Sequence, residues 1–117
     1  MTEVSGVAVD ARLLDGLTMI ASRAAAAILA ISPSALARRE KPDNSPVTAA
    51  DEASEATILE GLRGLLPGIP VVSEESVGKV PSASQEDGYV LVDPLDGTRE
   101  LLAGRDEFTV NIAIISR

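Results

Sequence analysis

Apolar residues recur at three- and four-residue intervals in two segments, and this spacing predicts two amphipathic helices. The first helix runs from Asp10, a candidate N-cap, to Ile31, and Ser32-Pro33 provides its stop. The second helix starts at Thr48 and ends at Pro67-Gly68. The positions expected to be buried are Leu13, Leu14, Leu17, Ile20, Ala21, Ala24, Ile28 and Ile31 in the first helix, and Ile58, Leu59, Leu62, Leu65 and Leu66 in the second.

Three shorter apolar runs predict strands. Residues 70–73 form a short run that leads into acidic residues, residues 89–92 form a second run after Gly88, and residues 108–114 alternate in polarity. No partner follows the last strand, and an unpaired apolar strand is a liability for a folded protein. We therefore expect the polypeptide to be incomplete.

The composition narrows the available chemistry. The 117 residues fit one domain or half of a larger one, and a formal net charge of −8 argues against binding a nucleic-acid polymer. The chain has no Cys and no His, which excludes disulfides, thiol chemistry and an imidazole base. The apolar stretch 24–31 lacks the pattern of a secretory leader and is too short to span a bilayer, so the expected location is the cytoplasm. The groups that remain available for catalysis or binding are carboxylates, hydroxyls and a bound cation.

Acidic residues at the end of the second strand are the strongest chemical signal. Asp93 and Asp96 lie three residues apart around Pro94, and Gly97 and Thr98 follow before a helix-compatible stretch. Hard cations such as Mg²⁺ take oxygen ligands and share them with phosphates, while a helix N-terminus can hold an anion. The alternative is a simple turn, because Asp-Pro and Asp-Gly both favour turns.

Two further acidic positions lie at predicted element boundaries. Asp51 falls in the first turn of the second helix, and Glu74-Glu75 directly follow a strand. Each has a plain structural alternative: Asp51 suits a capping box, and the glutamates suit a solvated turn.

Taken together, three motifs resemble the inositol monophosphatase superfamily of lithium-sensitive, Mg²⁺-dependent phosphatases. They are Asn44-Ser-Pro-Val-Thr-Ala-Ala-Asp51, Ser73-Glu-Glu75 and Asp93-Pro-Leu-Asp-Gly-Thr98. Three longer segments, Lys41–Asp51, Asp93–Glu100 and Glu107–Ile112, resemble the bacterial 3′(2′),5′-bisphosphate nucleotidase branch, CysQ. Members of this branch remove the 3′-phosphate of adenosine 3′,5′-bisphosphate in sulfur assimilation. The resemblance implies an α+β fold, the layered α/β sandwich of inositol monophosphatase and fructose-1,6-bisphosphatase. Residues 1–117 would form a single incomplete domain, the N-terminal metal- and phosphate-binding half, with two helices packed on a mainly antiparallel sheet.

The resemblance also implies a set of metal ligands. Glu74, Asp93 and the carbonyl of Leu95 would hold one Mg²⁺, and Asp93 with Asp96 would help to hold a second. Metal-assisted hydrolysis with two or more ions would activate water, and Li⁺ is expected to inhibit.

Catalytic and substrate-binding roles follow from the same resemblance. Asp51 would orient Thr98, and Thr98 with Glu74 would activate the attacking water. Gly97 would bring backbone N–H groups to the phosphate. The implied substrate-binding residues are Glu74, Leu95, Asp96, Gly97 and Thr98.

The chain departs from the family pattern in two ways. The family's second half, with a Trp-Asp motif that supplies another metal ligand, has no counterpart here, and Leu101 stands where the pattern usually has Phe.

Several alternatives stay open. One is an inositol-phosphate phosphatase with the same metal residues. Another is a non-catalytic fragment that binds one metal ion or assembles through an edge strand, and a third is a purely structural acidic module. A homodimer and a peripheral position at the inner membrane face also stay open.

Overall fold

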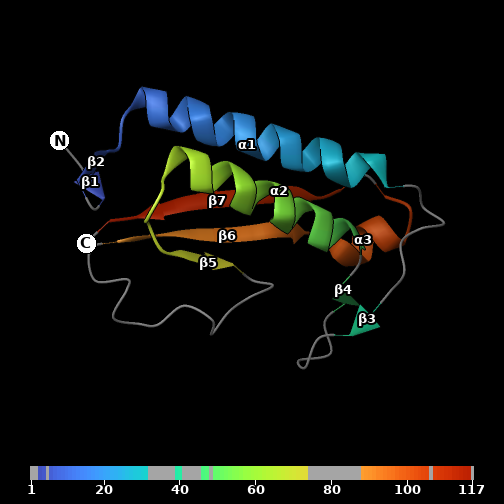
Figure 1. Cartoon of the computed structure of the whole chain (residues 1–117). Helices are drawn as coiled ribbons and strands as arrows, with labels where there is room; N and C mark the ends of the chain where they lie inside the picture. The colour runs from blue at the N-terminus through green and yellow to red at the C-terminus, as the bar shows by residue number, and fades with distance from the viewer. Residues whose placement is uncertain are drawn as a thin grey trace.

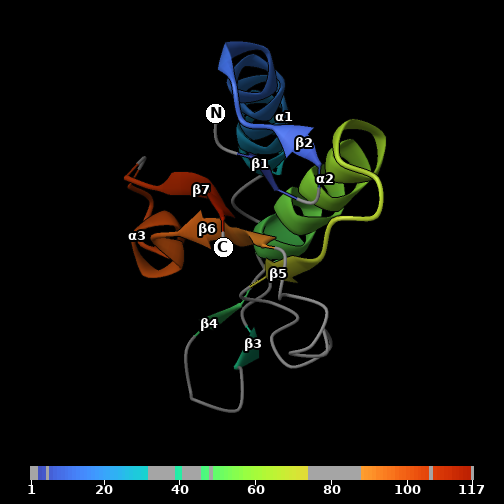
Figure 2. The ribbon, with the colours of Figure 1, turned by 90° about the vertical axis from the view of Figure 1, so that its left-hand side faces the viewer.

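The computed structural model describes residues 3–4, 6–31, 39–40, 46–47, 49–73, 88–105 and 107–116. Its larger elements form two layers, with helices α1 and α2 covering one face of the sheet β5-β6-β7 (Figures 1 and 2). In chain order the elements are β1 (Glu3–Val4), β2 (Val7–Ala8), α1 (Ala11–Ala30), β3 (Arg39–Glu40), β4 (Pro46–Val47), α2 (Ala49–Leu65), β5 (Val71–Ser73), β6 (Tyr89–Asp96), α3 (Thr98–Leu102) and β7 (Thr109–Ile115). The predicted α+β class is confirmed.

Helix α1 begins as its sequence predicts. Asp10 is extended and its carboxylate accepts a hydrogen bond from the backbone N–H of Leu13, at 3.0 Å, which satisfies one free donor of the first turn. The helix ends at Ala30, and its predicted stop signal lies outside the described residues. Its buried residues are Leu13, Leu17, Ile20, Ala24 and Ile28.

One predicted core position of α1 is wrong. Leu14 has 54% of its side chain exposed, whereas Leu17, three residues on, has 6% exposed. Leu14 lies next to Leu13 along the chain, so it points about 100° away from the buried face. The three- and four-residue spacing therefore identified the buried face of α1 correctly but included one exposed residue, Leu14.

The two long helices approach closely because each presents a glycine to the other. A Cβ atom on Gly61 would lie 2.7 Å from the side chain of Ile20, and one on Gly16 would lie 2.9 Å from the side chain of Leu65. The absence of a side chain at these two positions leaves space that a leucine and an isoleucine fill. Helix α2 buries the predicted Ile58, Leu62 and Leu66, the last just beyond its end.

The sheet is mixed. Strands β5 and β6 are parallel, whereas β6 and β7 are antiparallel. Six of its residue pairs are antiparallel and three are parallel, so antiparallel pairing dominates among the described residues, as predicted. The small pairs β1-β2 and β3-β4, which form separate sheets, are also antiparallel. The last strand does have a partner, because β7 pairs along its length with the preceding β6. Strand β6 also continues to Asp96, beyond the predicted end at residue 92.

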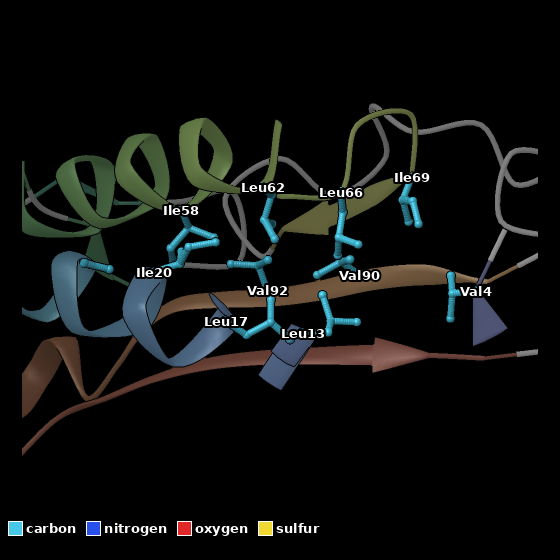
Figure 3. Packing of buried hydrophobic residues seen from close by; sticks show 11 residues of the cluster. Val4, Leu13, Leu17, Ile20, Ile58, Leu62, Leu66, Ile69, Val90 and Val92 are labelled. Carbon is cyan, nitrogen blue, oxygen red and sulfur yellow. The ribbon is translucent and has the colours of Figure 1, made fainter. Parts of the chain in front are cut away.

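Apolar side chains from the helices meet one face of the sheet in the main core (Figure 3). Val90 and Val92 of β6 are fully buried there and contact the cluster formed by α1 and α2. Aliphatic residues supply this core, as the low aromatic content predicts; its buried members are Val4, Leu13, Leu17, Ile20, Ala24, Ile58, Leu62, Leu66, Ile69, Val90 and Val92. A second, smaller cluster consists of Ile28, Ala50 and Leu95. Leu95, which lies between Asp93 and Asp96, thus has its side chain in the hydrophobic interior.

By length and a mean hydropathy of 1.5, α1 could also cross a membrane, which the shorter run 24–31 could not. This is weak evidence, since core helices and signal sequences have the same properties. The contacts of α1 with α2 and with the core account for its apolar stripe without a membrane.

Substitutions of Leu17 and Leu14 test the packing of α1 on the core. Leu17→Ala should lower the free energy of unfolding by about 2–5 kcal/mol, because it opens a cavity in the core. Leu14→Ala, the matched control, should change it by about 0.5 kcal/mol or less, because the side chain already contacts water. Urea denaturation measures both, and equal losses would contradict the assignment of Leu14 to the surface.

Candidate metal and phosphate site

An additional residue in β6 shapes the acidic segment. Asp93 pairs with Asn111, and the next pair joins Asp96 to Thr109, so three steps along β6 match two steps along β7. Such a β-bulge is one of the few places where a strand tolerates proline, because proline lacks the N–H that the ladder needs. Pro94 occupies this position and is buried, as is Leu95 after it. The segment is therefore a bulged strand, and the alternative of a simple turn is wrong.

The bulge determines which way the two aspartates face. In a regular strand, residues three apart point to opposite faces. Thr109 and Asn111 are two apart and share a face, and the side-chain amide of Asn111 donates a hydrogen bond to the hydroxyl of Thr109 at 3.0 Å. Because Asp93 and Asp96 lie opposite these residues, the register places both on that same face, away from Val92 and the helices.

Asp51 and Thr98 are brought together from positions 47 residues apart. The Thr98 hydroxyl donates a hydrogen bond to Oδ1 of Asp51 at 3.1 Å, and Asp51 is only 1% exposed. A carboxylate is buried at a cost that hydrogen bonds must offset. Asp51 lies in the first turn of α2, as predicted, but its carboxylate makes a tertiary contact that a simple helix cap would not make.

Two further side chains of α2 hold the ends of the strands. The hydroxyl of Ser54, which is 0% exposed, donates to the carbonyl of Pro94 at 2.6 Å. One residue further, Glu55 accepts a hydrogen bond at 3.2 Å from the hydroxyl of Ser73, the last residue of β5. The first turns of α2 therefore contact both β5, at its last residue, and β6, within its acidic segment.

Gly97 allows the chain to turn sharply from β6 into α3. It has a φ of 110° at the N-cap of α3, and a Cβ there would lie 2.6 Å from the carbonyl oxygen of Glu107. Both the backbone conformation and the space exclude a side chain. Thr98, the first residue of α3, is thereby directed back to α2.

Six of the seven predicted site residues lie in the described parts of the chain. Glu74 lies outside them. The structure brings Asp51 to Thr98 and places Asp93 and Asp96 on one face, with Leu95 between them and its side chain in the smaller core cluster. Their catalytic, metal-binding and substrate-binding roles remain predictions.

Ser54 and Glu55 were not predicted as site residues, and Ser73 was noted only as part of the motif Ser73-Glu-Glu75. Ser54 and Glu55 lie three and four residues after Asp51 and share its helix face, and this spacing is the signal that could have pointed to these two residues.

The donor chemistry of this face fits a hard divalent cation. Two carboxylates on one face, with a backbone carbonyl between them, supply only oxygen ligands. Within the described ranges no group of three or more acidic, histidine or cysteine side chains gathers where it could hold a metal ion. A complete ligand set therefore requires Glu74 or a group from elsewhere.

Gly97→Ala should destabilise the fold more than Gly104→Ala. Both glycines have positive φ, which costs an alanine about 1–2 kcal/mol. The Cβ at Gly104 would meet open space, whereas at Gly97 it would meet backbone, so we expect a further loss of about 1 kcal/mol or more. Urea denaturation measures the difference; an equal loss at both positions would show that the close approach to Glu107 is unimportant.

Comparison with known proteins agrees with this arrangement. The family model described as "Inositol monophosphatase family" matches residues 10–117. The 3′(2′),5′-bisphosphate nucleotidase CysQ of Salmonella typhimurium is 45% identical over 109 residues, which cover 90% of this chain and 44% of that protein. The chain thus spans less than half the length of this relative.

Solved structures share the fold. The extragenic suppressor protein SuhB of Bartonella henselae aligns with a TM-score of 0.80 and 28% identity, covering 91% of this chain and 41% of that one. CysQ of Bacteroides thetaiotaomicron aligns with a TM-score of 0.65 and 32% identity, covering 92% and 39%. The predicted sandwich type is confirmed, and the chain belongs to the inositol monophosphatase family.

Proposed function

We propose that this chain carries the metal- and phosphate-binding half of a phosphatase that removes the 3′-phosphate of adenosine 3′,5′-bisphosphate. The observation that carries the proposal is the bulge in β6, which gives Asp93 and Asp96 a common face beside the Thr98–Asp51 hydrogen bond. The identity to relatives named 3′(2′),5′-bisphosphate nucleotidase supports the substrate. Residues 1–117 would act as one domain.

The metal ligands in this proposal are Glu74, Asp93, the Leu95 carbonyl and Asp96. Mg²⁺ bound there would lower the pKa of a water molecule and neutralise charge on the phosphate. An acidic chain with no histidine needs such a cation to handle a phosphate, because its own carboxylates repel one.

Thr98 is suited to position the attacking water. Its hydroxyl hydrogen is directed to Asp51, so the oxygen lone pairs are free to accept a hydrogen bond from water. Asp51 fixes this orientation, and its burial keeps competing water away from the carboxylate. The backbone N–H groups of Gly97 and Thr98 would donate to the phosphate oxygens.

An inositol phosphate is the second candidate substrate, because the matching family is named for inositol monophosphatase. In either case the substrate is a small phosphate ester rather than a nucleic-acid polymer, which suits the net charge of −8. We place the enzyme in the cytoplasm and expect Li⁺ to compete with the activating cation.

The substrate assignment is tested by incubating the complete gene product that contains this chain with MgCl₂ and measuring phosphate released from adenosine 3′,5′-bisphosphate and from inositol 1-phosphate. We expect release that requires Mg²⁺ and is faster with the nucleotide. A preference for inositol 1-phosphate would replace the nucleotidase assignment. Metal binding without release from either substrate would favour the non-catalytic alternative.

Asp93→Asn tests the metal site without catalysis. We expect about a tenfold or greater loss of affinity for Mn²⁺, used as a spectroscopic substitute for Mg²⁺, because the change removes a charged oxygen ligand. Asp15→Asn is the control, since Asp15 is exposed on α1 and should leave affinity unchanged. Electron paramagnetic resonance of free Mn²⁺ gives both values, and unchanged affinity in Asp93→Asn would support a purely structural module.

A further inference from the structure

Ser54 makes the shortest of the tertiary side-chain hydrogen bonds described above. Its oxygen lies 2.6 Å from the carbonyl oxygen of Pro94, 40 residues later in the chain, and the serine is 0% exposed. This separation is at the short end of the range for hydroxyl donors. A serine in the interior of a helix usually bonds to its own helix or to water, so a bond to a distant strand calls for a reason.

The reason lies in the bulge. Between the Asp93–Asn111 and Asp96–Thr109 pairs, β6 has one residue more than β7, so the regular ladder is interrupted at Pro94 and Leu95. The carbonyl of Pro94 is turned toward α2 instead, where only a side chain can satisfy it. A buried carbonyl without a donor is unfavourable, so the bulge depends on the Ser54 hydroxyl.

We propose that Ser54 is a positioning residue for metal binding, which acts by holding the bulge that gives Asp93 and Asp96 a common face. The inference rests on the proposed function, since it assigns Ser54 a role at the same site. Ser54 does not touch the metal. It holds the peptide that joins Pro94 to Leu95, which lies between the two carboxylates and next to the peptide that carries the Leu95 carbonyl.

The matched control is a second hydroxyl on the same helix. Thr57 donates to the carbonyl of Ala53 at 2.9 Å, a local bond within α2. Thr57→Val removes one hydroxyl from α2 just as Ser54→Ala does, but leaves the contact with β6 intact.

Mn²⁺ binding to the purified 117-residue chain is the first measurement. We expect Ser54→Ala to raise the dissociation constant about fivefold or more, Thr57→Val to change it less than about twofold, and Ser54→Cys, with a weaker donor of similar size, to fall between them. Wild-type affinity in Ser54→Ala, in a chain that binds Mn²⁺, would overturn the proposal and leave the proposed function standing.

Cross-strand nuclear Overhauser effects in the metal-free chain are the second measurement, and they do not depend on metal binding. Ser54→Ala should weaken the contacts of the Asp93–Asn111 and Asp96–Thr109 pairs and preserve those of Val90 with Ile114. Preservation of all three would overturn the proposal. If the wild-type chain binds no Mn²⁺, the proposed function fails, and these contacts alone decide the role of Ser54. If Ser54→Ala does not fold, Ser54→Cys is judged by the same two criteria.

Discussion

One additional residue in β6 is the constraint on which the acidic face depends. Side chains of a strand alternate, so a spacing of three would send Asp93 and Asp96 to opposite sides of the sheet. The bulge restores a common side, and proline suits it because the ladder needs no N–H there. At the same interruption the buried carbonyl of Pro94 needs a hydrogen-bond donor outside the strand ladder, and Ser54 of α2 provides it. The bulge in β6 and the hydroxyl donor on α2 therefore depend on each other.

Helix α2 has two functions along its length. Its middle and end carry Ile58 and Leu62 into the main core, where they pack against the sheet (Figure 3). Its first turns carry Asp51, Ser54 and Glu55 to the ends of β6 and β5 and to the start of α3. Because the polar and the apolar groups lie on the same helix, the hydrophobic packing that stabilises the fold also positions the candidate site.

The sequence predicted local features well and long-range ones less well. The Asp10 cap, the α1 stripe and the alternating β7 were confirmed because short-range spacing encodes them. Leu14 was misplaced because spacing does not fix the width of a buried face. The extension of β6 was missed because Asp-Pro is also a turn signal, and only the pairing with β7 shows the bulge. Ser54 was missed because its partner lies 40 residues away.

The reciprocal glycines between α1 and α2 bear on the site as well as on packing. A side chain follows the rotation of its helix, so a rotation of α2 about its own axis would carry the Ser54 hydroxyl away from the Pro94 carbonyl. Ile20 packs against Gly61 and Leu65 packs against Gly16, and these two close contacts oppose such a rotation. The angular precision of the acidic site is thus set partly at the opposite end of α2, by residues that have no polar side chain at all.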